Sequence, residues 1–150
     1  MSESTKPWDD VSDEAIASLR ETRLDLGDGF TKNAADLVLG WAQHVVRLKV
    51  EADGATPAEL AWNAWDYVAA LVLRELCEIH LVKSSNAGVD AMRVLAATDE
   101  VLRSFTEDDP RGVVRRFAAD DAGTGWWWSR IPASGPIRTE LDGWASRVRW

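Results

Sequence analysis

Two carboxylates interrupt an apolar helix face near the middle of the chain. Glu75 and Glu78 are three residues apart, and a helical projection places them on the same side as Leu71 and Ile79. A buried carboxylate is costly unless it is paired, protonated or bound to a cation. Because side chains at i and i+3 can converge, a metal bound by Glu75 and Glu78 is one alternative, although His80 projects from another face. The Glu-x-x-His spacing of di-iron bundles is missing.

Arginine is the partner that we expect for both carboxylates. Arg74 is adjacent in sequence. A second arginine is expected from a short basic segment that contains Arg111, Arg115 and Arg116. Paired in this way, Glu75 and Glu78 would be structural residues, and we expect neither a bound metal nor a cofactor.

Arg74 and His80 form an R-x5-H pattern on the same stretch. This spacing resembles the R-x4-6-H motif of HEPN-domain ribonucleases, which are helical proteins of similar length. The resemblance implies that Arg74 and His80 act on a scissile phosphate, usually across a dimer. The chain departs from the family pattern at the residue after the arginine. A polar residue is common there in the family, whereas Glu75 places a negative charge at that position. On a straight helix Arg74 and His80 also lie about 120° apart. A ribonuclease or another hydrolase is therefore kept as the alternative function.

Three consecutive tryptophans, Trp126, Trp127 and Trp128, form the third candidate site. They occur in a segment without helical periodicity, residues 120–135, which is long for a loop in a small domain. Neighbouring side chains diverge in any regular backbone, so we expect at least one of the three to pack and at least one to be exposed. With Arg130 and Arg138 nearby, this composition is typical of binding hot spots. A structural role as a plug for the helical bundle is the competing interpretation.

Composition argues against several classes of protein. The chain has 150 residues and a net charge of −8, which disfavours a generic nucleic-acid binder and suits a basic protein partner. Walker, GxGxxG, HExxH and GxSxG motifs are absent. The single cysteine, Cys77, is expected in the core. The polar, acidic N-terminus has no apolar signal region, so the cytoplasm is the expected location.

The element that must position these residues is a long helix over about 56–83. Thr56, Pro57 and Glu59 match a capping box at its start. Apolar residues surround the helix on nearly all sides, which is typical of a buried helix. Asp66 and Arg74 leave only residues 67–73 uncharged between them, too few to span a membrane. We therefore place this helix at the centre of the fold and expect no membrane association.

Helical periodicity predicts the surrounding elements as well. Shorter helices are expected over about 12–25, 31–52, 88–106 and 110–119, with a last one from about 134. Residues 1–10 are polar and expected to fray. The sequence thus predicts one all-α domain over 1–150, a bundle of five to six helices around the 56–83 helix. Its expected function is that of a small, acidic, non-enzymatic interaction protein with a protein partner. Adaptor, inhibitor, antitoxin or immunity-type and phage-accessory roles fit equally, and a homodimer is left open.

Overall fold

The computed structural model describes residues 6–9, 11–54, 56–83 and 88–148, and within them six α-helices confirm the all-α prediction. The prediction that residues 1–10 fray falls mostly outside the described residues. The helices are α1 (Asp13–Glu21), α2 (Ala34–Ala52), α3 (Ala64–Cys77), α4 (Val89–Phe105), α5 (Val113–Ala118) and α6 (Pro136–Arg147).

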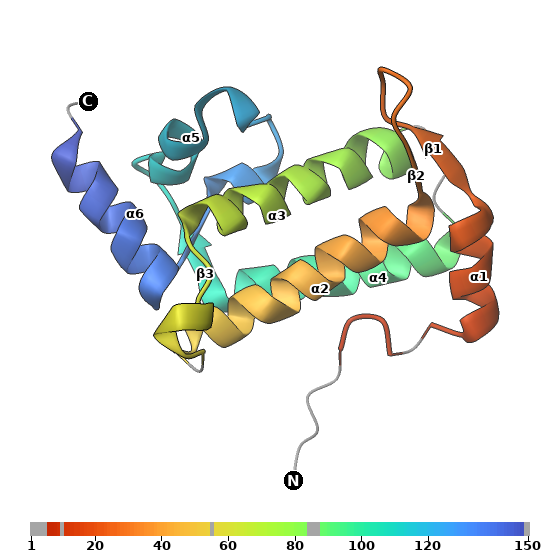
Figure 1. The fold of residues 1–150 in the computed structure, drawn as a ribbon, viewed down its shortest axis with the longest axis horizontal. Helices are drawn as coiled ribbons and strands as arrows, with labels where there is room; N and C mark the ends of the chain where they lie inside the picture. Colours follow the sequence, from red (N-terminus) through yellow and green to blue (C-terminus); the bar gives the residue numbers. More distant parts are fainter. Residues whose placement is uncertain (1–5, 10, 55, 84–87, 149–150) are drawn as a thin grey trace, which may run out of the picture.

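Helix α2 contacts α1, α3, α4 and α6, so it shares the central position with α3 (Figure 1). Helix α1 lies at one end of the long helices, and α5 and α6 lie at the other end. The buried side chains form one hydrophobic cluster that runs from Leu19 to Ala145. The predicted stripe on α2 is confirmed, since Leu37, Trp41 and Val45 are all fully buried.

The central helix is shorter than predicted at its N-terminal end. It begins at Ala64, because Asn63 and Asp66 form a reciprocal capping box: the Asn63 side chain accepts from the Asp66 amide at 3.1 Å, and the Asp66 carboxylate accepts from the Asn63 amide at 2.8 Å. The predicted capping box that begins at Thr56 instead precedes a single 3-10 turn, η1 (Ala58–Leu60). At the other end α3 widens into a π turn, η2 (Glu78–Val82).

Two short antiparallel hairpins were not predicted. Strand β1 (Arg23–Asp25) pairs with β2 (Thr31–Asn33), so the first helix ends at Glu21 and not near residue 25. Gly27 and Gly29, expected to end that helix, lie with positive φ in the hairpin turn. Strand β3 (Thr106–Asp108) pairs with β4 (Arg130–Pro132), and this pairing brings the tryptophan segment back to the end of α4.

The segment predicted as a long loop over residues 120–135 is built from short ordered pieces. It includes the 3-10 turn η4 (Trp126–Ser129) and then strand β4. A further 3-10 turn, η3 (Ala119–Asp121), links the segment to α5. None of the described helices is long and apolar enough to cross a membrane.

Candidate functional site

Arg74 lies at the centre of a buried network that links α3, α4 and the π turn. Its guanidinium donates two hydrogen bonds to Asp99, at 2.9 and 3.0 Å, and one to Glu78 at 3.1 Å. The indole of Trp41 donates to the same Asp99 carboxylate at 3.2 Å. Burial alone would lower the pKa of Arg74, but the hydrogen bonds and charges of Asp99 and Glu78 raise it. This arginine therefore stays charged, and carboxylates accept three of its hydrogen bonds.

The tryptophan segment packs directly onto this network. The ring of Trp127 lies against the Arg74 guanidinium, 4.2 Å from centroid to carbon. Trp128 donates its indole hydrogen to Glu75 at 2.7 Å. Trp127 and Trp128 are 2% and 0% exposed. The candidate sites that the sequence treated separately thus meet in one place, which we call the tryptophan–carboxylate cluster: Arg74, Glu75, Glu78, Asp99, Trp127 and Trp128.

Two glycines allow the segment to approach α3 this closely. A Cβ on Gly123 would lie 2.2 Å from the Glu75 carboxylate oxygen, and one on Gly125 would lie 2.2 Å from the Trp127 ring. Arg115 fixes the same backbone by donating to the Gly123 carbonyl, and to the Gly125 carbonyl and Ser129 hydroxyl at 3.3 Å each. The segment is therefore held in place on both sides.

Arg130 and Arg138, which were predicted to flank a binding surface, form hydrogen bonds that hold the β3–β4 hairpin. Arg130 donates to Asp108 at 2.8 Å and to the Thr106 carbonyl at 2.7 Å. Arg138 donates to Glu107 at 2.6 Å and to both oxygens of Asp142 at 3.0 Å. These hydrogen bonds give both arginines a structural role in the described fold.

The predicted carboxylate pairing is half right. Glu78 pairs with Arg74, as predicted, but the partner of Glu75 is an indole and not an arginine. Asp99 and Arg103 lie four residues apart on α4, yet Asp99 turns inward to pair with Arg74. Arg103 instead pairs with Glu100 at 2.6 Å and covers the Trp126 ring at 3.8 Å.

The alternative sites receive little support from this geometry. Arg74 is buried, donates to Asp99 and Glu78 and lies against the Trp127 ring, so the fold encloses the guanidinium that would have to bind the phosphate of a ribonuclease substrate. His80 lies partly buried on the π turn. Among the described residues, no three histidine, cysteine or acidic side chains group as metal ligands. A hollow of about 230 Å³ beside Glu75, Glu78, Trp126 and Trp127 is bordered by these already engaged groups.

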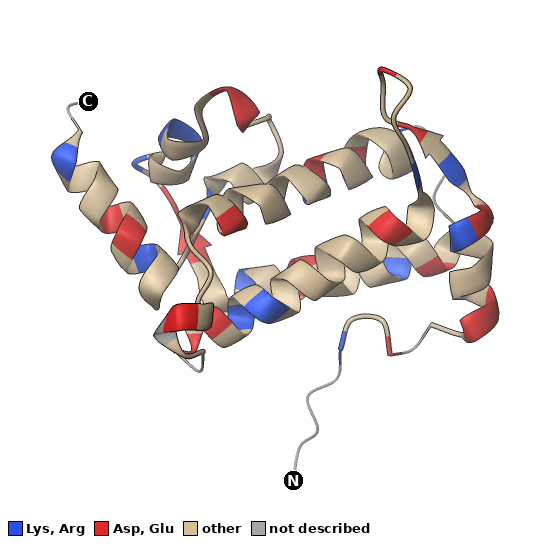
Figure 2. Cartoon of the chain, in the orientation of Figure 1, with Lys and Arg blue, Asp and Glu red and all other residues tan. Residues whose placement is uncertain are grey.

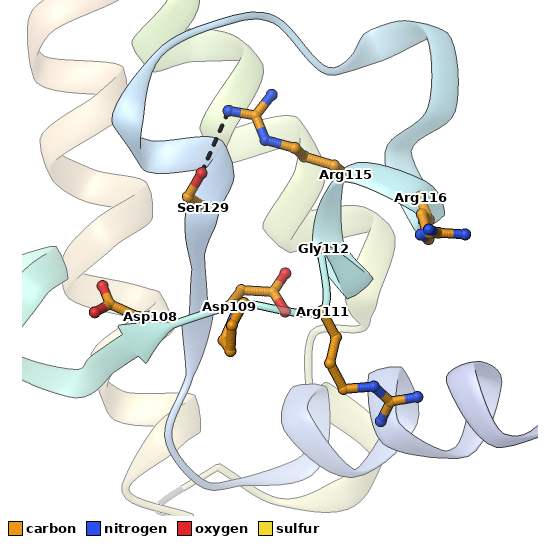
Figure 3. A pocket seen from close by; sticks show the side chains of 8 residues that line it. Asp108, Asp109, Arg111, Gly112, Arg115, Arg116 and Ser129 are labelled. Carbon is orange, nitrogen blue, oxygen red and sulfur yellow. Dashed lines mark hydrogen bonds between the residues drawn. The ribbon is translucent and has the colours of Figure 1, made fainter. Parts of the chain in front are cut away.

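A wider hollow of about 510 Å³ lies where the β3–β4 hairpin meets α5 (Figure 3). Arg115 points across it to Ser129. Asp109 accepts hydrogen bonds from the Val113 and Val114 amides, although α5 begins only at Val113, after the N-cap residue Gly112. The structure uses these lining groups to join β3 to α5.

Large apolar side chains are exposed on several of the described elements, and two of them lie along the central helix, Trp65 in α3 and Ile79 in the π turn η2. Trp65 is 55% exposed and Ile79 is 44% exposed, although the sequence predicted a helix buried on nearly all sides. The Trp65 ring packs against Phe117 of α5 in a tilted arrangement with centroids 4.4 Å apart, and Phe117 and Trp144 of α6 meet edge to face at 5.3 Å. Leu60, predicted to face the core, is 63% exposed because its turn precedes the helix.

No protein-family model matches this chain, and neither curated proteins nor solved structures gave a match.

Proposed function

We propose that this chain is an acidic, non-enzymatic protein-interaction module of the cytoplasm, and that its partner binds the outer face of α3. The observation that carries the proposal is the exposed, pre-positioned indole of Trp65. The residue is 55% exposed, yet its ring packs against Phe117 with centroids 4.4 Å apart. A rigid, exposed tryptophan is a common hot-spot residue, because little conformational entropy is lost when it is covered.

The binding surface that we propose differs from the tryptophan segment that the sequence favoured. Trp127 and Trp128 are buried in the tryptophan–carboxylate cluster, so neither presents its ring to a partner in this structure. Trp126 is partly buried beneath Arg103. The sequence around Trp65 did not indicate that this residue would be exposed. Its exposure depends on the position of α5, which contacts one side of the ring and leaves the other side uncovered.

Net charge supports a basic partner. The chain carries −8, and basic surfaces associate faster with acidic ones at low salt. Adaptor, inhibitor, antitoxin or immunity-type and phage-accessory proteins would all use such a surface, and the proposal does not choose among them.

A site-specific photocrosslinker tests this function. Placed at Ala69, an exposed position one turn after Trp65, it should capture a protein partner in cells of the source organism. Val89 on α4 is 76% exposed and provides the control position. Capture from position 69 but not from 89 is the expected result. Equal capture from both positions, or from neither, would contradict the proposal.

A substitution gives the complementary test. Trp65→Ala should leave the melting temperature nearly unchanged, because the side chain is more than half exposed. Binding of the captured partner should weaken by about 30-fold or more, which corresponds to a hot-spot loss of about 2 kcal/mol. A fall in binding that is accompanied by unfolding would assign Trp65 a structural role instead.

A further inference from the structure

The outer face of α3 carries apolar residues at the spacing of a helix-pairing seam. Trp65, Ala69, Val72, Leu76 and Ile79 are separated by four, three, four and three residues. That alternation repeats every seven residues and is the pattern by which one helix packs along another. We call these five residues the α3 seam; four of them lie in α3, and Ile79 lies in the π turn η2 that follows it. Lys83, four residues beyond Ile79, ends it with a charge.

The seam is distinct from the face that α3 turns to the core. Tyr67, Ala70, Leu71 and Cys77 are fully buried on that inner face. In the seam, Trp65, Ala69 and Ile79 are exposed, whereas Val72 and Leu76 are partly buried and pack against the core. The described part of the chain therefore covers the floor of the seam and leaves its two ends open.

Neighbouring elements give the seam a raised border. Phe117 of α5 lies against Trp65, and the tryptophan segment lies against Glu75 on the same side. Helix α2 lies on the other side, where a Cβ added to Gly40 would lie 3.8 Å from the Leu73 side chain. A partner helix laid between these borders would meet the seam over about four turns, since the five residues span about 21 Å at 1.5 Å per residue.

The charges that α3 itself places beside the seam are acidic. Asp66 and Glu75 occupy positions next to it, and Glu78 is 23% exposed at the start of the π turn. Figure 2 shows acidic residues along α3, whose only basic residue is Arg74, buried in the tryptophan–carboxylate cluster. Coiled-coil partners choose one another by opposite charges at these flanking positions.

A second copy of this chain fits the seam poorly. Two α3 helices pairing in either direction would set acidic flanks against acidic flanks, between two chains that each carry −8. Like charges across such an interface cost several kcal/mol. Charge complementarity thus favours a different protein with a basic flank.

We propose that the α3 seam binds an amphipathic α-helix of the partner protein, with apolar residues at heptad spacing and lysine or arginine beside them. This inference rests on the proposed function, because it names the partner structure that the same surface would take. The partner helix would lie along α3, with its basic side chains beside Asp66 and Glu75.

A synthetic helix tests the inference directly. The probe is a 28-residue peptide with leucine at the seam positions of four heptads and lysine at the flanks, titrated by calorimetry. The control peptide has the same composition with the heptad order scrambled. Specific binding predicts an affinity at least tenfold higher for the heptad peptide. Equal affinity for both peptides would show attraction by charge alone and would overturn the inference.

Matched variants locate the binding site. Ala69→Arg places bulk and positive charge in the seam, and Ala96→Arg makes the same change at an exposed position of α4. Peptide affinity should fall at least tenfold in Ala69→Arg and stay within twofold in Ala96→Arg. Ile79→Gln, a milder change, should weaken binding in the same direction. Equal losses in Ala69→Arg and Ala96→Arg would overturn the inference.

Two further outcomes separate this inference from the proposed function. If no peptide binds but the crosslinker at position 69 still captures a partner, the interaction function stands and the helical partner is wrong. If sedimentation shows a dimer that Ala69→Arg dissociates, the occupant is a second copy and the inference is again wrong. Binding that weakens as salt rises from 50 to 300 mM agrees with a basic helix, since exposed charges are screened.

Discussion

The ion pair between Arg74 and Asp99 is central to the stability of the tryptophan–carboxylate cluster. Both side chains are buried, and Arg74 also supports the ring of Trp127. In a buried pair the attraction largely offsets the desolvation cost, so removing one partner leaves an uncompensated charge. The cluster should therefore respond strongly to the loss of either member.

Asp99→Ala tests this directly. We expect the free energy of unfolding to fall by about 3–5 kcal/mol, because Arg74 would keep its charge with only Glu78 beside it. Urea unfolding at neutral pH measures the loss. Glu100→Ala, which removes an exposed partner of Arg103, is the control and should cost under about 1 kcal/mol. A similar small loss for Asp99→Ala would mean that water reaches the buried pair.

Cys77 gives a prediction about alkaline pH. Burial raises the pKa of its thiol to about 12 from an ordinary value of 9.0. Above pH 9 the unfolded chain loses this proton while the folded chain keeps it, so the unfolded state binds fewer protons and stability falls as pH rises. At pH 10.5 this one group should cost roughly 2 kcal/mol.

Comparison with Cys77→Ala isolates that contribution from those of other titrating groups. Under reducing conditions, stability should decline less steeply in the variant than in the parent chain between pH 8.5 and 10.5. Parallel declines would show that the thiol ionises in the folded state and that its surroundings are wetter than the structure indicates.

At the scale of elements, the start of α3 distinguishes two capping boxes that look equally good in sequence. Thr56 and Glu59 have the favoured residue types, and so do Asn63 and Asp66. The second box prevails in the structure, where the Ala64 amide also donates to Glu140 of α6 at 2.9 Å. That acceptor comes from a distant part of the chain, so local sequence cannot reveal it.

Substitution of each cap should show the same preference. Asn63→Ala should destabilise the chain by about 1 kcal/mol, within the usual range for a lost N-cap. Thr56→Ala should change stability by under about 0.5 kcal/mol, because Thr56 lies outside the helices. Thermal unfolding of the two variants measures the difference. The reverse order would mean that α3 begins near residue 57 after all.

The difference between local sequence signals and contacts with distant parts of the chain also explains which elements the sequence could predict. Helices α2 and α4 follow from their stripes, since each buries residues at helical spacing such as Leu37, Trp41 and Val45. The three-residue strands, such as Arg23–Asp25 and Thr31–Asn33, are too short to show alternation and contain charged residues. They form because turns and neighbouring helices bring them together, which is tertiary information.

At the scale of the whole molecule, the sequence identified many of the right residues but assigned the right partner only to Glu78, which pairs with Arg74. Arg74, Glu75, Glu78 and the three tryptophans do converge. Their partners lie 25 residues away for Arg74 and Asp99, and 53 residues away for Glu75 and Trp128. Without an alignment or a fold, such separations cannot be read from spacing. The exposed side of Trp65 likewise depends on where α5 and α6 are placed.

The hydrogen bonds that α3 receives from the C-terminal third also set the order in which the chain can fold during synthesis. Glu75 is synthesised before its hydrogen-bond partner Trp128. The Ala64 amide is likewise synthesised before its acceptor Glu140, which follows it by 76 residues. Domains are made from the N-terminus at about 5–20 residues per second, so α3 is complete several seconds before these partners emerge. A nascent chain arrested after residue 122 should therefore remain protease-sensitive. Protection should appear only when residues 123–148 have left the ribosome, and earlier protection would show that α1–α4 fold without them.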